Sequence, residues 1–168
     1  DMTATKSTAG KDTLRLTSSA FRQGEVIPVQ FTCEGEDLSP PLEWSGAPLE
    51  TRSFALICDD PDAPRGTWVH WMLYSLPGDA VKLETGVPIG PELPSGARQG
   101  LNDSGDLGYS GPCPPPGYPH RYFFRLHALD SVLGLPPGLH RADLEKAMSG
   151  HILAHCSLMG TFQRHRKQ

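Results

Sequence analysis

Short apolar segments separated by turns dominate the pattern of this chain. They are rich in Val, Ile, Phe, Tyr and Trp and recur between Pro and Gly turns, at residues 14–17, 26–32, 53–58, 67–76 and 121–129. This rhythm is typical of an antiparallel β-sandwich. Alternation within the last segment predicts a strand with one buried face. That face carries Tyr122, Phe124, Leu126 and Ala128.

The C-terminal part of the chain predicts one short helix followed by a strand. Leu144 and Met148 lie at helical spacing within residues 141–148, and Gly150 stands just past the last turn. Residues 152–159 are apolar at both odd and even positions. A strand that is apolar on both faces is expected in the middle of a sheet.

Length and composition favour one mainly β domain. The chain has 168 residues, of which 18 are Gly and 17 are Pro, so long uninterrupted helices are not expected. Residues 1–11 are small and polar and predict a flexible segment ahead of a single domain at 12–168. Two long turn-rich stretches, 77–107 and 108–119, are expected to be ordered functional loops.

The charge balance argues against nucleic acid as a partner. Fifteen basic and 19 acidic side chains give a net charge of -4, and the only basic cluster lies at residues 164–167. The longest purely apolar run, 54–58, is far shorter than the roughly 20 residues that cross a bilayer. We therefore expect a soluble protein, cytoplasmic by default, or periplasmic or secreted if an export signal was removed.

Three carboxylates follow the apolar segment 53–58, within the run Asp-Asp-Pro-Asp-Ala-Pro. Asp and Pro are ordinary turn residues, so a plain turn is one interpretation. However, three carboxylates at the end of a buried strand repel one another unless neighbouring groups organise them. If the segment stays extended, Asp60 and Asp62 share a side.

Two histidines occupy similar positions in two other segments. In a strand, side chains two residues apart lie on the same face, so Trp68 and His70 share one face of their segment. In the same way, His120 and Tyr122 share one face of the segment where the chain leaves the Pro-rich loop. A histidine in a strand is more often a hydrogen-bonded core residue than a ligand-binding residue. The alternative is that the histidines, the phenol and the carboxylates form one small polar pocket for an anion or a polar head group.

Catalytic and metal sites find little support in the motifs. Compact His-x-His and His-Glu-x-x-His spacings, a Gly-x-Ser-x-Gly elbow and Cys-x-x-Cys pairs are all missing from the sequence. We therefore predict no metal, no cofactor and no enzymatic activity, and keep a hydrolase only as a remote third class.

Four motifs in order resemble the phosphatidylethanolamine-binding protein family. They are Leu-Ser-Pro-Pro-Leu-Glu-Trp at 38–44, Asp-Pro-Asp-Ala-Pro at 60–64, Trp-Val-His-Trp at 68–71, and Gly-Tyr-Ser-Gly-Pro at 108–112 with His-Arg-Tyr at 120–122. The Gly-Pro-Cys-Pro-Pro-Pro-Gly run and the ending after the last strand resemble the bacterial and archaeal YbhB/YbcL branch. Animal members of the family are known as Raf kinase inhibitor proteins.

The resemblance implies a Greek-key sandwich of two antiparallel sheets with one or two short helices and an anion pocket at one end. It implies as pocket residues Asp60, Asp62, Pro64, Trp68, His70, Gly111, Pro112, His120 and Tyr122. The implied ligand is phosphate or a phosphoryl group such as phosphorylethanolamine. The implied alternative is an inhibitor or regulator of a kinase or serine protease that acts through surface contacts, and a homodimer is left open.

Two further expectations come from the resemblance. It suggests a cis peptide at Ala63-Pro64, which would aim the carboxylates inward. It also places Cys33 and Cys113 at the pocket end, where they could form a disulfide if the protein is exported.

Overall fold

Ten short elements make up the fold in this computed structural model, which describes residues 13–165. The flexible segment predicted at 1–11 lies outside the described residues. In chain order the elements are β1 (Arg15–Thr17), the 3₁₀ helix η1 (Val29–Phe31), β2 (Leu42–Ser45), β3 (Ser53–Asp60), β4 (Trp68–Pro77), β5 (Lys82–Leu83), β6 (Arg98–Gln99), β7 (His120–Leu129), α2 (Arg141–Met148) and β8 (Ile152–Phe162).

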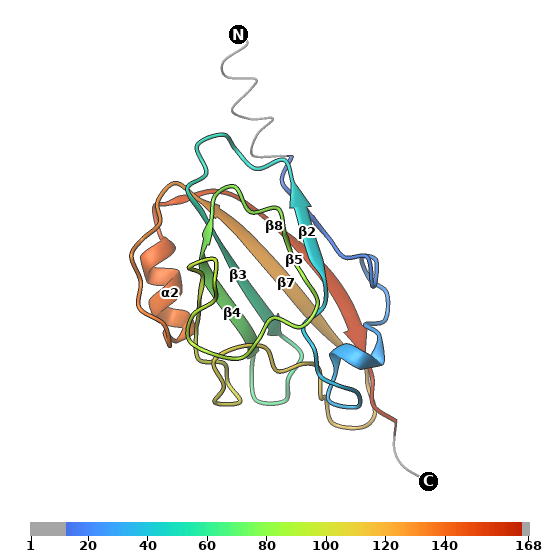
Figure 1. The fold of residues 1–168 in the computed structure, drawn as a ribbon. Helices are drawn as coiled ribbons and strands as arrows, with labels where there is room; N and C mark the ends of the chain where they lie inside the picture. Colours follow the sequence, from blue (N-terminus) through green and yellow to red (C-terminus); the bar gives the residue numbers. More distant parts are fainter. Residues whose placement is uncertain (1–12, 166–168) are drawn as a thin grey trace.

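Two antiparallel sheets face each other, and a helix covers the outside of the larger one (Figure 1). The smaller sheet has the strand order β1-β2-β5, and the larger has the order β6-β4-β3-β7-β8. The mainly β sandwich and the helix over 141–148 predicted from the sequence are therefore confirmed.

Two hydrophobic cores separate these three layers. Between the sheets, Phe54, Leu56 and Cys58 of β3 pack with side chains of the smaller sheet. On the other face of β3, Ala55 and Ile57 pack against side chains of α2. All eight residues of β3 are buried, which explains why its central part, residues 54–58, is an unbroken apolar run rather than an alternating one.

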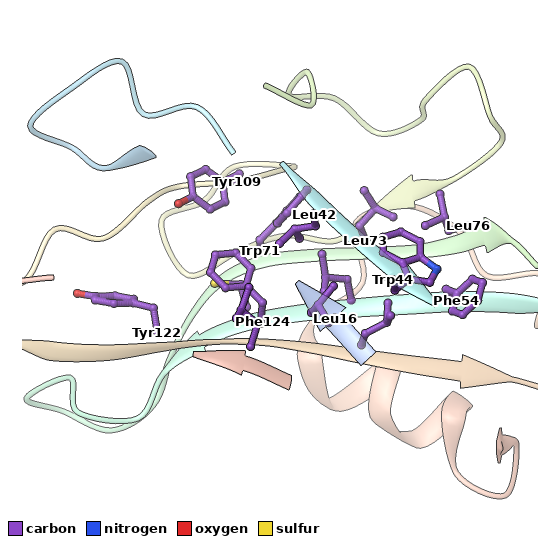
Figure 2. Packing of buried hydrophobic residues seen from close by; sticks show 14 of the residues in the cluster. Leu16, Leu42, Trp44, Phe54, Trp71, Leu73, Leu76, Tyr109, Tyr122 and Phe124 are labelled. Carbon is purple, nitrogen blue, oxygen red and sulfur yellow. The ribbon is translucent and has the colours of Figure 1, made fainter. Parts of the chain in front are cut away.

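The core between the sheets gives way to polar side chains at one end. Figure 2 shows Trp71 and Phe124 packed together, with Tyr122 beyond them and its hydroxyl directed away from the apolar side chains. The inner face of β7 carries the four residues that alternation predicted, all fully buried. They are Tyr122, Phe124, Leu126 and Ala128.

Two predicted elements differ in the structure. Residues 26–32 do not form a strand, because Pro28 leads into η1 and only Val26 bridges to β8, at Thr161. The strand after the helix, β8, lies at the edge of the larger sheet rather than in its middle. Its outer face is only partly covered, since Leu153 and Met159 are half-buried.

No helix within residues 13–165 is long and apolar enough to cross a membrane.

Candidate functional site

A cavity of about 270 Å³ opens at the end of the sandwich where β3 ends and β4 and β7 begin. Twelve residues line it: Asp60, Ala63, Pro64, Trp68, His70, Ser104, Gly111, Cys113, Pro114, Pro115, His120 and Tyr122. Seven of the nine residues predicted from the resemblance are among them. The two exceptions are Asp62 and Pro112.

Strand alternation delivers three of the polar side chains to the cavity. The inward row of β3 runs through Leu56 and Cys58, and its next member is Asp60. The inward row of β7 includes Tyr122 and His120. The pattern that builds the core therefore also builds the polar end of the cavity.

A β-bulge brings His70 to the same side. Cys58 pairs with Trp71, but the next pair along is Asp59 with Val69, so His70 is an extra residue in β4. A bulge re-aims the side chains on one side of it. Val69 consequently faces the helix side of the sheet, whereas His70 joins the cavity.

Asp60 and His120 form a buried pair inside the cavity. Nδ1 of His120 lies 2.7 Å from Oδ2 of Asp60, and Asp60 is only 3% exposed. The carboxylate accepts a hydrogen bond from Nδ1–H, and its Oδ1 accepts a second, at 2.7 Å, from the main-chain N–H of Asp62. No described residue hydrogen-bonds Nε2 of His120.

His70 is held as a neutral ring. Its Nδ1 lies 2.6 Å from the carbonyl oxygen of Ser110, and because a carbonyl only accepts, Nδ1 carries the proton. Burial lowers the pKa of His70, although the bond to Ser110 and the charge of Asp60 oppose this effect. Nε2 therefore presents a lone pair, and within residues 13–165 no group donates to it.

Tyr122 carries a buried hydroxyl that no well-formed hydrogen bond satisfies. The side chain is 0% exposed, and its hydroxyl makes no hydrogen bond of ordinary geometry within the described residues, although the carboxylate of Asp60 lies beside it. Burial first, and then the charge of Asp60, raise the pKa of Tyr122 well above its usual value, so the phenol keeps its proton. Such a group is costly unless it is completed by water or a ligand.

Asp62 turns away from the cavity. Its two oxygens accept hydrogen bonds from the guanidinium of Arg121 at 2.9 Å each, and Oδ2 also accepts the Arg121 main-chain N–H at 3.0 Å. The predicted shared side for Asp60 and Asp62 is wrong, because the chain turns after Asp60 instead of staying extended. Asp62 fastens this turn to β7.

The third carboxylate, Asp59, faces the helix side of the sheet. It is 1% exposed and forms a two-point pair with Arg125, at 2.9 and 3.0 Å, and a third contact with Arg141 of α2 at 2.8 Å. Each of the three neighbouring carboxylates thus has a different cationic or histidine partner. Because each carboxylate faces its own partner, the three do not repel one another strongly.

The predicted cis peptide at Ala63-Pro64 is wrong, because the described residues contain no cis bond. The turn is closed instead by the bond from Asp62 N–H to the Asp60 carboxylate and by a bond from Gly66 N–H to the Ala63 carbonyl. Side-chain pairing, rather than a cis bond, aims the carboxylates.

A disulfide joins the two loops that form the rim. Cys33 and Cys113 are bonded, with their Cα atoms 5.4 Å apart, as the resemblance suggested. The Cys33 N–H also donates to the carbonyl of Pro112 at 3.1 Å. Of the two free thiols, Cys58 is buried, whereas Cys156 is only half-buried.

Gly111 lets the same two loops approach closely. A Cβ at this position would lie 2.2 Å from the carbonyl oxygen of Phe31 and 2.4 Å from the Asp37 carboxylate. The Gly111 N–H donates to Asp37 at 2.8 Å, and the Tyr109 hydroxyl donates to the Phe31 carbonyl at 2.7 Å. The rim is therefore tied at several points, and the Gly111 N–H is already engaged.

Asn102 organises the loop behind His70, and sequence reasoning missed it. Its buried amide donates to the carbonyl of Gly108 at 2.8 Å, and its Oδ1 accepts the N–H groups of Ser104 and Asp106 at 2.9 Å each. An Asn at the head of a turn is a known local signal, and Asn-Asp-Ser-Gly carries it. Only the fold shows that this turn supports the cavity.

The lining is rich in hydrogen-bond acceptors and contains no Lys or Arg. Within residues 13–165, no group of three or more His, Cys, Asp or Glu side chains could hold a metal ion. The cavity can therefore hold a small polar group and form hydrogen bonds with it.

Known sequences include a matching family model and several relatives of this chain. The family model described as phosphatidylethanolamine-binding protein matches residues 17–163. A UPF0098 protein of Methanothermobacter thermautotrophicus is 52% identical over 151 residues, covering 90% of this chain and 99% of that protein. A UPF0098 protein of Aquifex aeolicus is 48% identical over 158 residues, covering 93% of this chain and 92% of that protein.

Two crystal structures are similar over most of the chain. CT736 of Chlamydia trachomatis, a phosphatidylethanolamine-binding protein homolog, has a TM-score of 0.82 and 41% identity, covering 93% of this chain and 99% of that one. YbcL of E. coli, described as a new member of the mammalian PEBP family, has a TM-score of 0.82 and 32% identity, covering 89% and 98%.

Proposed function

Because the chain belongs to the phosphatidylethanolamine-binding protein family, we propose that its cavity binds a phosphate or phosphoryl head group without catalysing a reaction on it. The cavity, at about 270 Å³, suits a head group rather than a whole lipid. Three side chains from two strands bring polar atoms to it without engaging all of them, namely His70, His120 and Tyr122.

The Tyr122 hydroxyl is the observation that carries this proposal. A fully buried phenol whose oxygen makes no hydrogen bond of ordinary geometry among the described residues is rare in folded proteins, and a ligand oxygen would satisfy it better than the neighbouring Asp60 carboxylate does. The neighbouring Asp60–His120 pair and the ring of His70, 5.2 Å from the phenol ring, fix its position.

Binding without turnover is supported by the state of the possible nucleophiles. Cys113 lines the cavity but is held in the disulfide, so it offers no thiolate. Ser104 lines the cavity, but no hydrogen bond joins it to either histidine within the described residues. Nucleophilic catalysis needs such a bond to activate the hydroxyl.

Tyr122→Phe is expected to weaken binding of inorganic phosphate by about tenfold to a hundredfold while leaving the fold intact. The change removes one hydrogen bond to a charged ligand, which is worth roughly 1.5–3 kcal/mol. Isothermal titration calorimetry measures the loss. Tyr118→Phe is the matched control, because that side chain is 86% exposed, and it should bind like the wild type. Equal affinity in both variants would count against the proposal.

The alternative role, an inhibitor or regulator of a kinase or serine protease, stays a prediction. It relies on surface contacts, so it does not require the cavity to respond to phosphate.

We also propose that the natural protein works in an oxidising compartment. Structural disulfides persist in the periplasm and outside cells and are rare in a reducing cytoplasm. Thiol labelling of protein taken directly from its cells under denaturing conditions tests this. Two reactive cysteines, Cys58 and Cys156, are expected, and four would show a reduced pair in the cytoplasm.

A further inference from the structure

A second cavity, which we call the basin, lies at the opposite end of the sandwich, where β3 begins and β4 ends. Its volume of about 500 Å³ is within the range of small-molecule sites. Its lining comes from four segments, 52–53, 75–78, 95–98 and 132–135. None of these residues lines the first cavity, so the proposed function does not use the basin.

Backbone strain in this chain collects at the two cavities. Within residues 13–165, three residues other than glycine have a positive φ. Asp37, at 61°, accepts from Gly111 at the rim of the first cavity. Ser75, at 57°, lines the basin, and Leu133, at 70°, belongs to the loop 132–135. Residues held in this region cost free energy and cluster at binding sites, so the basin shares a property of the first cavity.

Ser75 occupies a position where glycine would be free of strain. It lies in a β-bulge, between the pairs Phe54–Leu76 and Leu56–Leu73, where two residues of β4 face one of β3. In one common type of bulge a glycine takes the left-handed conformation. The Ser75 hydroxyl makes no hydrogen bond within the described residues. It is therefore a free donor in the basin lining.

The basin presents one cation that has no partner. Arg52 is exposed, and its side chain makes no ion pair or hydrogen bond within residues 13–165, although its main-chain N–H donates to the carbonyl of Leu129 at 2.8 Å. The other guanidinium is engaged, because Arg98 pairs with Glu92 at 3.4 Å and donates to the carbonyl of Leu135. Among the residues that line the basin, none is Asp or Glu.

We propose that the basin binds an organic acid with a single negative charge, whose carboxylate pairs with Arg52 and whose apolar body packs on the basin floor. A guanidinium holds a planar carboxylate through two parallel N–H···O bonds, and the Ser75 hydroxyl supplies a further donor. A dianion would bring a second charge that no free cation of the lining balances. The floor for the apolar body consists of Leu76, Pro77, Val132 and Leu135.

Calorimetric titration of the whole protein with three probes tests the ligand class. At pH 7 and constant ionic strength, naphthoate should bind at least about tenfold more tightly than naphthamide, which has the same shape but no charge. Acetate has the charge but no apolar body, and should also bind at least about tenfold more weakly. No binding of naphthoate, or equal binding of all three probes, overturns the inference.

Inorganic phosphate at high concentration separates the two cavities. Because they lie at opposite ends of the sandwich, phosphate should leave the affinity for naphthoate unchanged at the same ionic strength. Displacement of naphthoate by phosphate overturns this inference but leaves the proposed function standing.

Arg52→Met is expected to weaken naphthoate binding about tenfold or more, because it removes the charged donor and keeps a long side chain. Arg22→Met is the matched control. Arg22 is also exposed and its side chain has no printed partner within the described residues, but it lies outside the basin. It should bind naphthoate like the wild type. Equal affinity in the two variants overturns the role of Arg52.

Ser75→Gly separates binding from stability. Glycine adopts the left-handed conformation without strain, so the midpoint temperature of thermal unfolding should stay the same or rise. Loss of the hydroxyl should weaken naphthoate binding about tenfold. A variant that is at least as stable and binds more weakly is the expected result for strain retained at a binding site. Unchanged affinity, or weaker binding together with lower stability, overturns the role of Ser75.

Discussion

Replacing Cys33 and Cys113 together by serine is expected to lower the free energy of unfolding by about 4 kcal/mol. The disulfide joins residues 80 positions apart, and closing so long a loop removes much conformational entropy from the unfolded chain. Both residues are exposed, so serine at either position empties no core volume. Equilibrium unfolding in urea measures the change.

Reduction supplies the control for this result. Dithiothreitol should bring the wild type to the stability of the double variant and leave the variant itself unchanged. Cys156→Ser removes a thiol without opening a loop and should stay close to the wild type. If the double variant unfolds at the same urea concentration as the oxidised wild type, the bond is not a stabilising element.

The second large effect is expected on the helix side of the sheet. Arg125→Met combined with Arg141→Met should cost about 3 kcal/mol or more, because it leaves the Asp59 carboxylate buried without a cation. Each single variant leaves one arginine in place and should cost less. Thermal and urea unfolding of the three variants give these values.

Arg121→Met is the matched control for the double variant. Like Arg125, Arg121 pairs with a carboxylate and lies over the ring of Phe123, but its pair with Asp62 is exposed. Exposed pairs contribute little, so we expect little or no loss. A double variant as stable as this control would show that Asp59 needs no partner.

The larger elements of the fold could be predicted from the sequence because they are long enough to show a period. β7 alternates over ten residues, and α2 ends before a glycine. By contrast, β5 and β6 have two residues each, too few for any pattern. The position of β8 at the sheet edge depends on which strands pair, and apolar residues alone do not encode that.

For the site, residue type could be predicted but partner choice could not. His70 and His120 were found because imidazoles and carboxylates are the natural components of a polar pocket. The bulge that turns His70 inward arises from its pairing with β3, and no local signal marks it. In the same way, Asp62 joins Arg121, 59 residues away, instead of the cavity.

The tied rim has a consequence for the rate of ligand exchange. A covalent bond and the close approach at Gly111 hold the loops at residues 31–37 and 109–113 together, and neighbouring prolines stiffen one of them. Loops fixed in this way do not swing as a lid, so association requires no closing step on the microsecond to millisecond scale. The association rate constant of a ligand is then limited only by its diffusion and orientation. Differences in affinity between ligands therefore appear in their dissociation rate constants.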